Sequence, residues 1–252
     1  MIEAIDVHKS FGDKEILKGI STVFEKGKTN LIIGQSGSGK TVLLKSLVGL
    51  HDVTSGDIKY DGNSFAEMDS QRKKRLRQDI GMLFQGSALF DSLTVEENIR
   101  FPLDMFTDWS EEERRERANF CINRVKLENA NDKFPSEISG GMQKRVAIAR
   151  AISLNPKYLF CDEPNSGLDP RTSIVIDELI HEITQEFDMT TIVNTHDMNS
   201  VMGIGEKIIF IYQGNKLWEG TKDDIFHVQN KELEDFIFAS KLFKQVRDIS
   251  NK

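Results

Sequence analysis

The sequence is poor in cysteine and has no long apolar run. Its 252 residues include two cysteines, Cys121 and Cys161, which are far apart and lack a CxxC spacing. Such usage excludes a disulfide scaffold and indicates reduced thiols. No stretch approaches the roughly 20 apolar residues of a membrane helix; the best candidate, "VLLKSLVGL", is short and contains Lys45. The start, "MIEAIDVHKSF", has acidic residues and no apolar segment, so we expect no signal peptide.

Positive charge is also in short supply. Lys and Arg number 33 against 40 Asp and Glu, which gives a formal net charge of −7. Proteins that neutralise nucleic-acid phosphates are usually basic, so we expect no nucleic-acid partner. Hydrophobic residues make up 38% and charged residues 29% of the chain, as in a globular domain with a solvated surface. The length suffices for one substantial domain with an inserted subdomain.

Strand and helix patterns alternate along the chain. "IEAIDVH" alternates apolar and polar residues as a half-buried strand does, and "NLIIG" reads as a strand buried on both faces. "TVLLKSLVGL" and "TSIVIDELIHEITQEF" predict amphipathic helices. Residues 86–145 read as a mostly helical insert with a solvated charged face. The apolar face of its second half is predicted to contain Ala118, Cys121, Ile122 and Val125.

A glycine-rich loop follows the "NLIIG" strand. The run "GQSGSGKT" (34–41) fits G-x-x-x-x-G-K-[ST] at every position, between a predicted strand and a predicted helix. Its backbone N–H groups can wrap a phosphate chain where Cβ atoms would obstruct, Lys40 can reach the β- and γ-phosphates, and Thr41 offers a hydroxyl to Mg²⁺. The pattern predicts a nucleoside triphosphate site lined by Gly34, Gln35, Ser36, Gly37, Ser38, Gly39, Lys40, Thr41 and Val42.

Polar residues end three further apolar strands. In "YLFCDE" (158–163), Asp162 is predicted to hold Mg²⁺ through a water, and Glu163 to polarise the attacking water. Because parallel strands present ligand contacts at their carboxyl ends, His196 in "VNTHD" and Gln85 in "GMLFQ" are expected to join them. The predicted catalytic residues are Lys40, Gln85, Glu163 and His196, and the predicted metal ligands are Thr41, Gln85 and Asp162.

A second glycine pair opens the helix-forming run "EISGGMQKRVAIARAI" (137–152). It has a serine hydroxyl, glycine amides and a helix N-terminus, but no lysine at the position where the first loop has Lys40. It is therefore suited to contact one end of a phosphate that is held elsewhere. The economical explanation is a head-to-tail dimer with two nucleotides at the interface. Each nucleotide would be bound by the loop at 34–41 of one copy and by the glycine pair of the other copy.

In their order along the chain, these motifs resemble those of ABC transporter ATP-binding subunits over nearly the whole length. They are Phe11, Walker A at 34–41, Gln85, the signature "ISGGM" at 138–142, Walker B at 158–163, "SGLD" at 166–169 and His196. The resemblance implies that ATP is the nucleotide, that Phe11 stacks on adenine, and that Asp169 links the two sites. It also implies that Ser139, Gly140 and Gly141 form the contact to the partner copy's ATP. Ile138, Met142 and Phe11 depart from the commoner residues without removing a phosphate-contacting group, so an active ATPase is expected.

The fold implied by the resemblance is an α/β P-loop NTPase of the ABC ATPase type. It has a RecA-like mixed sheet core, an N-terminal antiparallel β-subdomain and an inserted α-helical subdomain. We predict one domain over 1–252, with an ATP-binding core at 1–85 and 146–220, the helical signature subdomain at 86–145, and a C-terminal helical segment at 221–252 that ends in a polar tail.

The segment "GMLFQGSALFDSLTVEENIRFPL" (81–103) resembles the ATPase of Mla-type phospholipid, or toluene-tolerance, transporters. This resemblance implies phospholipid transport, a membrane permease partner, an MCE-type lipid-binding protein, and a location on the cytoplasmic face of the inner membrane. Two readings of 88–93 stay open: its apolar residues dock a permease helix, or they pack a hinge between lobes. The basic run "RKKRLR" (72–77) is either a solvated face or a contact to lipid headgroups.

Other functions remain as alternatives. One is the ATPase of a transporter for amino acids, metals or lipoprotein release. Another is a soluble ABC ATPase of iron–sulfur assembly, DNA repair or translation. The repair class carries a long coiled coil between its P-loop and signature, for which this chain has no room, and the translation class usually has two ATPase units.

Overall fold

The computed structural model describes residues 1–228 and 230–238 and divides them into two compact units. The first contains residues 1–25, 29–66 and the chain from 194 onward, and the second contains 26–28 and 67–193. The predicted subdivision at 86, 146 and 221 stays a prediction, and the predicted polar tail lies outside the described residues.

An antiparallel sheet forms one part of the first unit. It consists of β1 (Ile2–Phe11), β2 (Lys14–Phe24), β4 (Ser55–Tyr60) and β5 (Asn63–Ser64), in the order β2-β1-β4-β5. The predicted alternation in β1 is interrupted at Asp6, whose φ is +47°, and the register to β2 shifts between Ala4 and Val7. Ile5, which follows the buried Ala4, is exposed, and the β-bulge turns Val7 inward.

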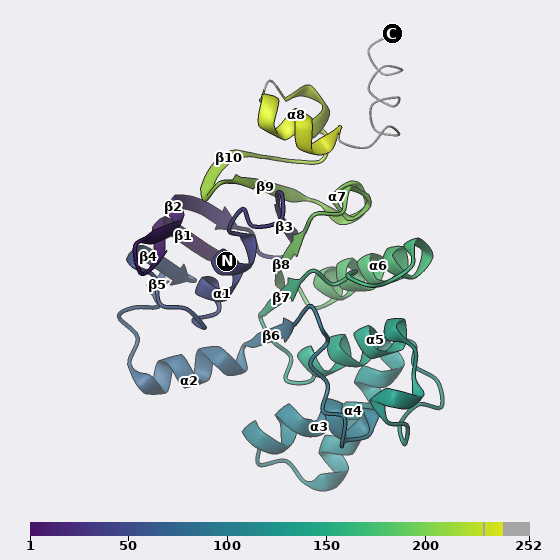
Figure 1. Cartoon of the computed structure of the whole chain (residues 1–252). Coiled ribbons are helices and arrows are strands. Elements are labelled where there is room, and N and C mark those ends of the chain that lie inside the picture. Colours follow the sequence, from purple (N-terminus) through teal and green to yellow (C-terminus); the bar gives the residue numbers. More distant parts are fainter. Residues whose placement is uncertain (229, 239–252) are drawn as a thin grey trace. The chain divides into compact units, whose positions relative to one another are not determined.

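The described residues of the first unit also form the strands β10-β9-β3 and three helices (Figure 1). β3 (Thr29–Ile33) pairs in parallel with β9 (Lys207–Tyr212), which pairs antiparallel with β10 (Asn215–Gly220). β3 is buried along its whole length, as "NLIIG" predicted. The helices are α1 (Lys40–Leu47), α7 (Met198–Ile204) and α8 (Lys231–Ile237), and a 3-10 turn spans Asp224–His227. The 3-10 turn and α8 lie in the segment predicted to be helical at 221–252, and most of the second half of that segment lies outside the described residues.

Helix α1 ends earlier than the run "TVLLKSLVGL" suggests. Gly49 has φ +72°, its N–H donates to the Ser46 carbonyl at 3.1 Å, and the Leu50 N–H donates to the Lys45 carbonyl at 2.9 Å. These two bonds form a Schellman motif, which glycine permits because it has no Cβ. The apolar run thus continues past the helix, and Leu50 is exposed.

The second unit combines strands β8-β7-β6 with five α-helices. The strands are β6 (Ile80–Leu83), β7 (Tyr158–Asp162) and β8 (Thr190–Thr195), whose last two residues belong to the first unit. The helices are α2 (Ser70–Gln78), α3 (Val95–Phe106), α4 (Glu111–Arg124), α5 (Gly140–Ala151) and α6 (Pro170–Glu186), and a 3-10 turn spans Pro135–Glu137. In α2, which carries "RKKRLR", Leu76 is the buried residue.

Helices α3, α4 and α5 pack against one another (Figure 1). The four residues predicted to share an apolar face of α4, Ala118, Cys121, Ile122 and Val125, are all buried. Burial in this apolar layer raises the pKa of Cys121 to about 11. The thiol therefore stays protonated at neutral pH, as expected of a structural cysteine.

The prediction that the charged face of α4 is only solvated is wrong for two arginines. Arg117 donates to the carbonyls of Ile152 and Ser153, and Arg124 pairs with Glu182 and Glu186 of α6. An arginine has five donors and a long apolar stem, so it can lie along a helix surface and bond the next element. Periodicity within α4 gives no indication of these partners, which lie on other elements.

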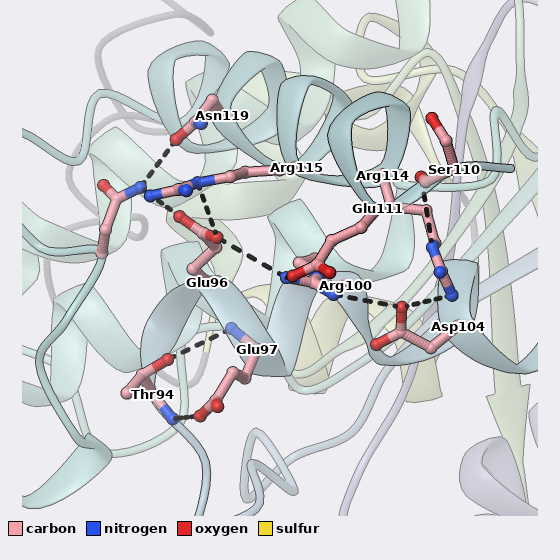
Figure 2. Close-up of polar contacts among 11 residues, drawn as sticks. Thr94, Glu96, Glu97, Arg100, Asp104, Ser110, Glu111, Arg114, Arg115 and Asn119 are labelled. Atoms are coloured by element: carbon pink, nitrogen blue, oxygen red, sulfur yellow. Dashed lines mark hydrogen bonds and ion pairs between the residues drawn. The ribbon is translucent and has the colours of Figure 1, made fainter.

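Ion pairs join α3 to α4 at the surface (Figure 2). Arg100 lies between Glu96 and Asp104, at 3.9 and 3.6 Å, and Arg114 of α4 reaches Asp104 at 3.0 Å. Both helices begin with capping boxes, Thr94 with Glu97 and Ser110 with Glu113. The N–H groups of Thr94 and Ser110 donate to these carboxylates and lower the pKa of Glu97 and of Glu113. These bonds fix where each helix starts.

Asn98 of α3 is fully buried and organises the segment before the helix. Its Nδ2 donates to the carbonyls of Phe90, Leu93 and Thr94 at 3.0 Å each, and its Oδ1 accepts from the Phe90 N–H at 2.9 Å. We expect Asn98→Ala to lower the free energy of unfolding by about 2–3 kcal/mol, because buried backbone groups lose their partners. Denaturant unfolding measures this. The control Asn123→Ala, at an exposed site on α4, should stay within about 0.5 kcal/mol of wild type, and equal stability of both variants would contradict the assignment.

Candidate active site

The glycine-rich loop connects β3 to α1 as predicted. Gly34 has φ +148°, and a Cβ there would lie 2.2 Å from the Ile211 carbonyl oxygen, so no other residue fits without a backbone shift. Gly39, at φ +110°, is the N-cap of α1. Steric contacts within the protein therefore require glycine at positions 34 and 39. The loop ends at the N-terminus of α1, where the first N–H groups of the helix are available to an anion.

The loop contains polar groups suited to a phosphate chain. Lys40 is only 6% exposed, and its Nζ donates to the carbonyls of Gly34 and Gln35 at 2.8 and 3.0 Å. The Ser38 hydroxyl is buried and has no hydrogen-bond partner within the described part of the chain. A buried polar group without a partner is costly. Phosphate oxygens would satisfy Ser38, the ammonium of Lys40 and the N-terminus of α1 together, so the residues present fit the triphosphate.

Asn194 is a site residue that the sequence analysis missed. It is fully buried near the end of β8, and its Nδ2 donates to the Thr41 Oγ1 at 3.0 Å. This bond fixes the hydroxyl that was predicted to ligate Mg²⁺. The available signal was a polar residue inside the apolar run "TTIVNT", whose carboxyl end had already been associated with the site through His196.

We expect Asn194→Ala to weaken binding of Mg-ATP about 3- to 10-fold, because Thr41 would lose the donor that orients it. Calorimetric titration with Mg-ATP, and with ATP in excess EDTA, measures the effect with and without the metal. The metal-free affinity should be unchanged. Asn123→Ala, at an exposed position of α4, is the control. An equal loss with and without Mg²⁺ would show that Asn194 does not act through the metal ligand.

Two more predicted residues belong to the first unit. Phe11 ends β1 with 47% of its surface exposed. His196 directly follows β8 and is exposed, and the next residue, Asp197, caps α7 by accepting from the Asn199 N–H at 2.8 Å. The cap fixes the turn in which His196 stands. The first unit thus contains Phe11, the P-loop, Thr41 with Asn194, and His196.

The acidic pair lies in the second unit. Every residue of β7 is buried, and Asp162 is its last residue. Glu163 follows with φ +49°, a conformation uncommon for a residue with a Cβ, and its carbonyl accepts from the Ser166 N–H at 3.1 Å. The backbone reverses direction there, so the two carboxylates do not continue the alternation of a strand. Local strain of this kind often accompanies functional residues.

Gln85 is linked to the chain that follows Glu163. Its Nε2 donates to the Ser166 Oγ at 3.3 Å, and Lys144 of α5 donates to the Gln85 carbonyl. Burial lowers the pKa of Lys144, with the nearby Asp162 acting in the opposite direction. Gln85, the loop after Walker B and the helix of the signature are therefore joined within one unit.

The signature forms the start of α5, as predicted. Ser139 is its N-cap and accepts from the Met142 N–H at 3.3 Å, and the residue is exposed together with Gly140. A Cβ on Gly141 would lie 2.6 Å from Thr172 Cγ2, so close packing on α6 requires this glycine. Asp169 caps α6, and the hydrogen bond from the Thr172 hydroxyl lowers the pKa of Asp169. Its carboxylate is therefore ionised and already bonded within its own chain.

Comparisons with known proteins agree with this organisation. A family described as ABC transporter matches residues 17–166. The methionine import ATP-binding protein MetN of Campylobacter jejuni is 34% identical over 256 residues, which cover 95% of this chain and 76% of that protein. The probable ribonucleotide transport ATP-binding protein mkl of Mycobacterium leprae is 34% identical over 241 residues, covering 96% and 67%. A solved dimeric ATP-binding cassette in a post-hydrolysis state, bound to ADP and Pi, matches with TM-score 0.79 and 33% identity over 88% of this chain and 99% of that one.

The chain therefore belongs to the ABC transporter family, as an ATP-binding cassette. The predictions of an ABC-type P-loop fold, of ATPase activity, and of ATP with Mg²⁺ are confirmed at the level of the family. The role of each individual site residue stays a prediction. Among the residues that the structure describes, no helix has the length and apolar character that crossing a membrane requires.

Proposed function

We propose that this chain is the ATP-hydrolysing subunit of an Mla-type transporter, and that it powers phospholipid transport through a membrane permease. In the site, the P-loop holds the triphosphate, Thr41, Gln85 and Asp162 hold Mg²⁺, and Glu163 and His196 act on the attacking water and the γ-phosphate. Bound Mg²⁺ neutralises charge that develops on the phosphate oxygens. The exposed Ser139 and Gly140 are placed to contact the ATP of a second copy in a head-to-tail homodimer.

The observation that carries the transport role is a set of exposed apolar side chains in the second unit. Four large side chains, Phe84, Phe90, Phe101 and Met105, are exposed by between 37 and 61%. Three lie in 81–103, the segment that resembles Mla-type ATPases, and a permease helix would cover them on the cytoplasmic side of the membrane. Phe90 also packs on Phe101, with ring centroids 4.6 Å apart, so docking and internal packing both use this ring.

Import of an amino acid is the second candidate. It is favoured by the names of relatives such as MetN of Campylobacter jejuni, which describe methionine import. In both candidate functions, the same ATP hydrolysis powers a membrane permease. They differ in the cargo and in the extracytoplasmic partner, and the MCE-type lipid-binding protein belongs to the phospholipid proposal alone.

One experiment separates the two. The full chain is purified in mild detergent from the membranes of its own organism, co-purifying proteins and lipids are identified by mass spectrometry, and ATPase activity is measured with added phospholipid or L-methionine. We expect a permease, an MCE-type protein and bound phospholipid, with activity that rises on phospholipid addition. A permease whose ATPase responds to methionine and not to phospholipid would overturn the lipid assignment.

A further inference from the structure

The ring of Phe11 is held from two sides by neighbours in the first unit. The Lys9 Nζ lies over the ring, 4.8 Å from its centroid, and donates to the Asp52 carbonyl at 2.6 Å. The His51 ring meets Phe11 nearly at a right angle, at 82°, with centroids 5.3 Å apart. A cation over a ring face and an edge-to-face aromatic pair are both favourable arrangements. They leave 47% of Phe11 exposed.

The segment that carries His51 and Asp52 is fixed to the P-loop helix. It follows the Schellman motif that ends α1, and the His51 N–H donates to the Lys45 carbonyl at 3.2 Å. At its other end, the Thr54 N–H donates to the His8 carbonyl at 2.8 Å, and the Ser10 N–H donates to the Thr54 Oγ1 at 2.9 Å. The ring is therefore linked by short contacts to the helix that begins with Lys40.

We propose that Lys9 and His51 are positioning residues that hold Phe11 as a stacking platform for the nucleotide base, at a fixed offset from the phosphate-binding loop. This inference rests on the proposed ATP site. Lys9 lies over one face of the ring and His51 stands nearly perpendicular to the ring, so we place the base on the face away from Lys9. The platform makes no hydrogen bond that reads a base edge, and it favours the larger π-surface of purines over pyrimidines without selecting adenine over guanine.

The test compares two ligands that share the phosphates and differ in the base. Calorimetry with the full chain gives the dissociation constants of Mg-ATP and of magnesium tripolyphosphate. His51→Ala and Lys9→Met are each expected to weaken Mg-ATP binding about 3- to 10-fold and to leave tripolyphosphate binding unchanged. His51→Phe and Lys9→Arg, which keep an aromatic edge and a cation, should restore ATP binding. Both altered positions are half-buried, and thermal unfolding checks that each variant is folded.

A double-mutant cycle shows whether the two residues act through Phe11. Phe11→Ala should remove the base-dependent part of the affinity, and adding His51→Ala or Lys9→Met to it should have no further effect. The control Lys59→Met, in the same antiparallel sheet, should bind both ligands as wild type does. The inference would be overturned if the losses of affinity added to that of Phe11→Ala, or if they were equal for ATP and tripolyphosphate. Neither result would contradict the proposed ATP site. A wild-type chain that does not bind Mg-ATP would overturn the proposed function itself.

Discussion

Glu163→Gln is expected to reduce ATP turnover by about 10³-fold while the chain still binds Mg-ATP. Proton acceptance from an attacking water by a positioned carboxylate accounts for rate factors of this order. An amide has the same shape and cannot accept that proton. Glu163 stands in the left-handed turn after β7, and its carbonyl accepts from the Ser166 N–H. The substitution should leave this backbone unchanged.

Two measurements accompany this variant. Phosphate release gives the turnover, and light scattering with saturating Mg-ATP gives the oligomeric state, which should shift to a dimer because hydrolysis no longer separates the copies. The control Glu178→Gln alters an exposed carboxylate on α6 and should hydrolyse ATP at the wild-type rate. Undiminished turnover in Glu163→Gln would remove Glu163 from the mechanism. A purely monomeric ATP-bound variant would contradict the head-to-tail dimer.

Lys40→Ala is expected to weaken Mg-ATP binding about 10- to 100-fold. Lys40 is nearly fully buried at the first position of α1, and its ammonium bonds the Gly34 and Gln35 carbonyls of the loop. A charge-assisted bond to phosphate in such surroundings is among the stronger polar interactions. Its removal also leaves two carbonyls without that donor.

Calorimetric titration measures the loss, and Lys45→Ala is the matched control. Lys45 stands in the last turn of the same helix, is half-exposed, and contributes its carbonyl rather than its side chain to the helix cap. Its truncation should leave ATP binding unchanged. Equal affinities of the Lys40→Ala variant and wild type would refute the assignment of 34–41 as a phosphate-binding loop.

Local patterns predicted most of the secondary structure of this chain. The buried strand at "NLIIG" and the apolar face of α4 both follow from short-range periodicity. The predicted end of α1 lies too far along the chain. The apolar run continues through Gly49, and periodicity alone does not indicate a left-handed cap. The break in β1 at Asp6 was missed for a similar reason: a bulge depends on pairing with another strand.

Sequence alone determined the chemistry. The glycines, Lys40 and Thr41 at their fixed spacing, and acids after an apolar strand, define a phosphate and magnesium site through covalent geometry and side-chain type, which are local properties. Only the tertiary structure shows which residues contact the predicted site residues. Asn194 donates to Thr41, Lys9 and His51 lie against Phe11, and Lys144 donates to the Gln85 carbonyl. Apart from Lys9 and Phe11, which stand two residues apart, these contacts join residues distant in the chain. They depend on where whole elements pack, which no window of neighbouring residues encodes.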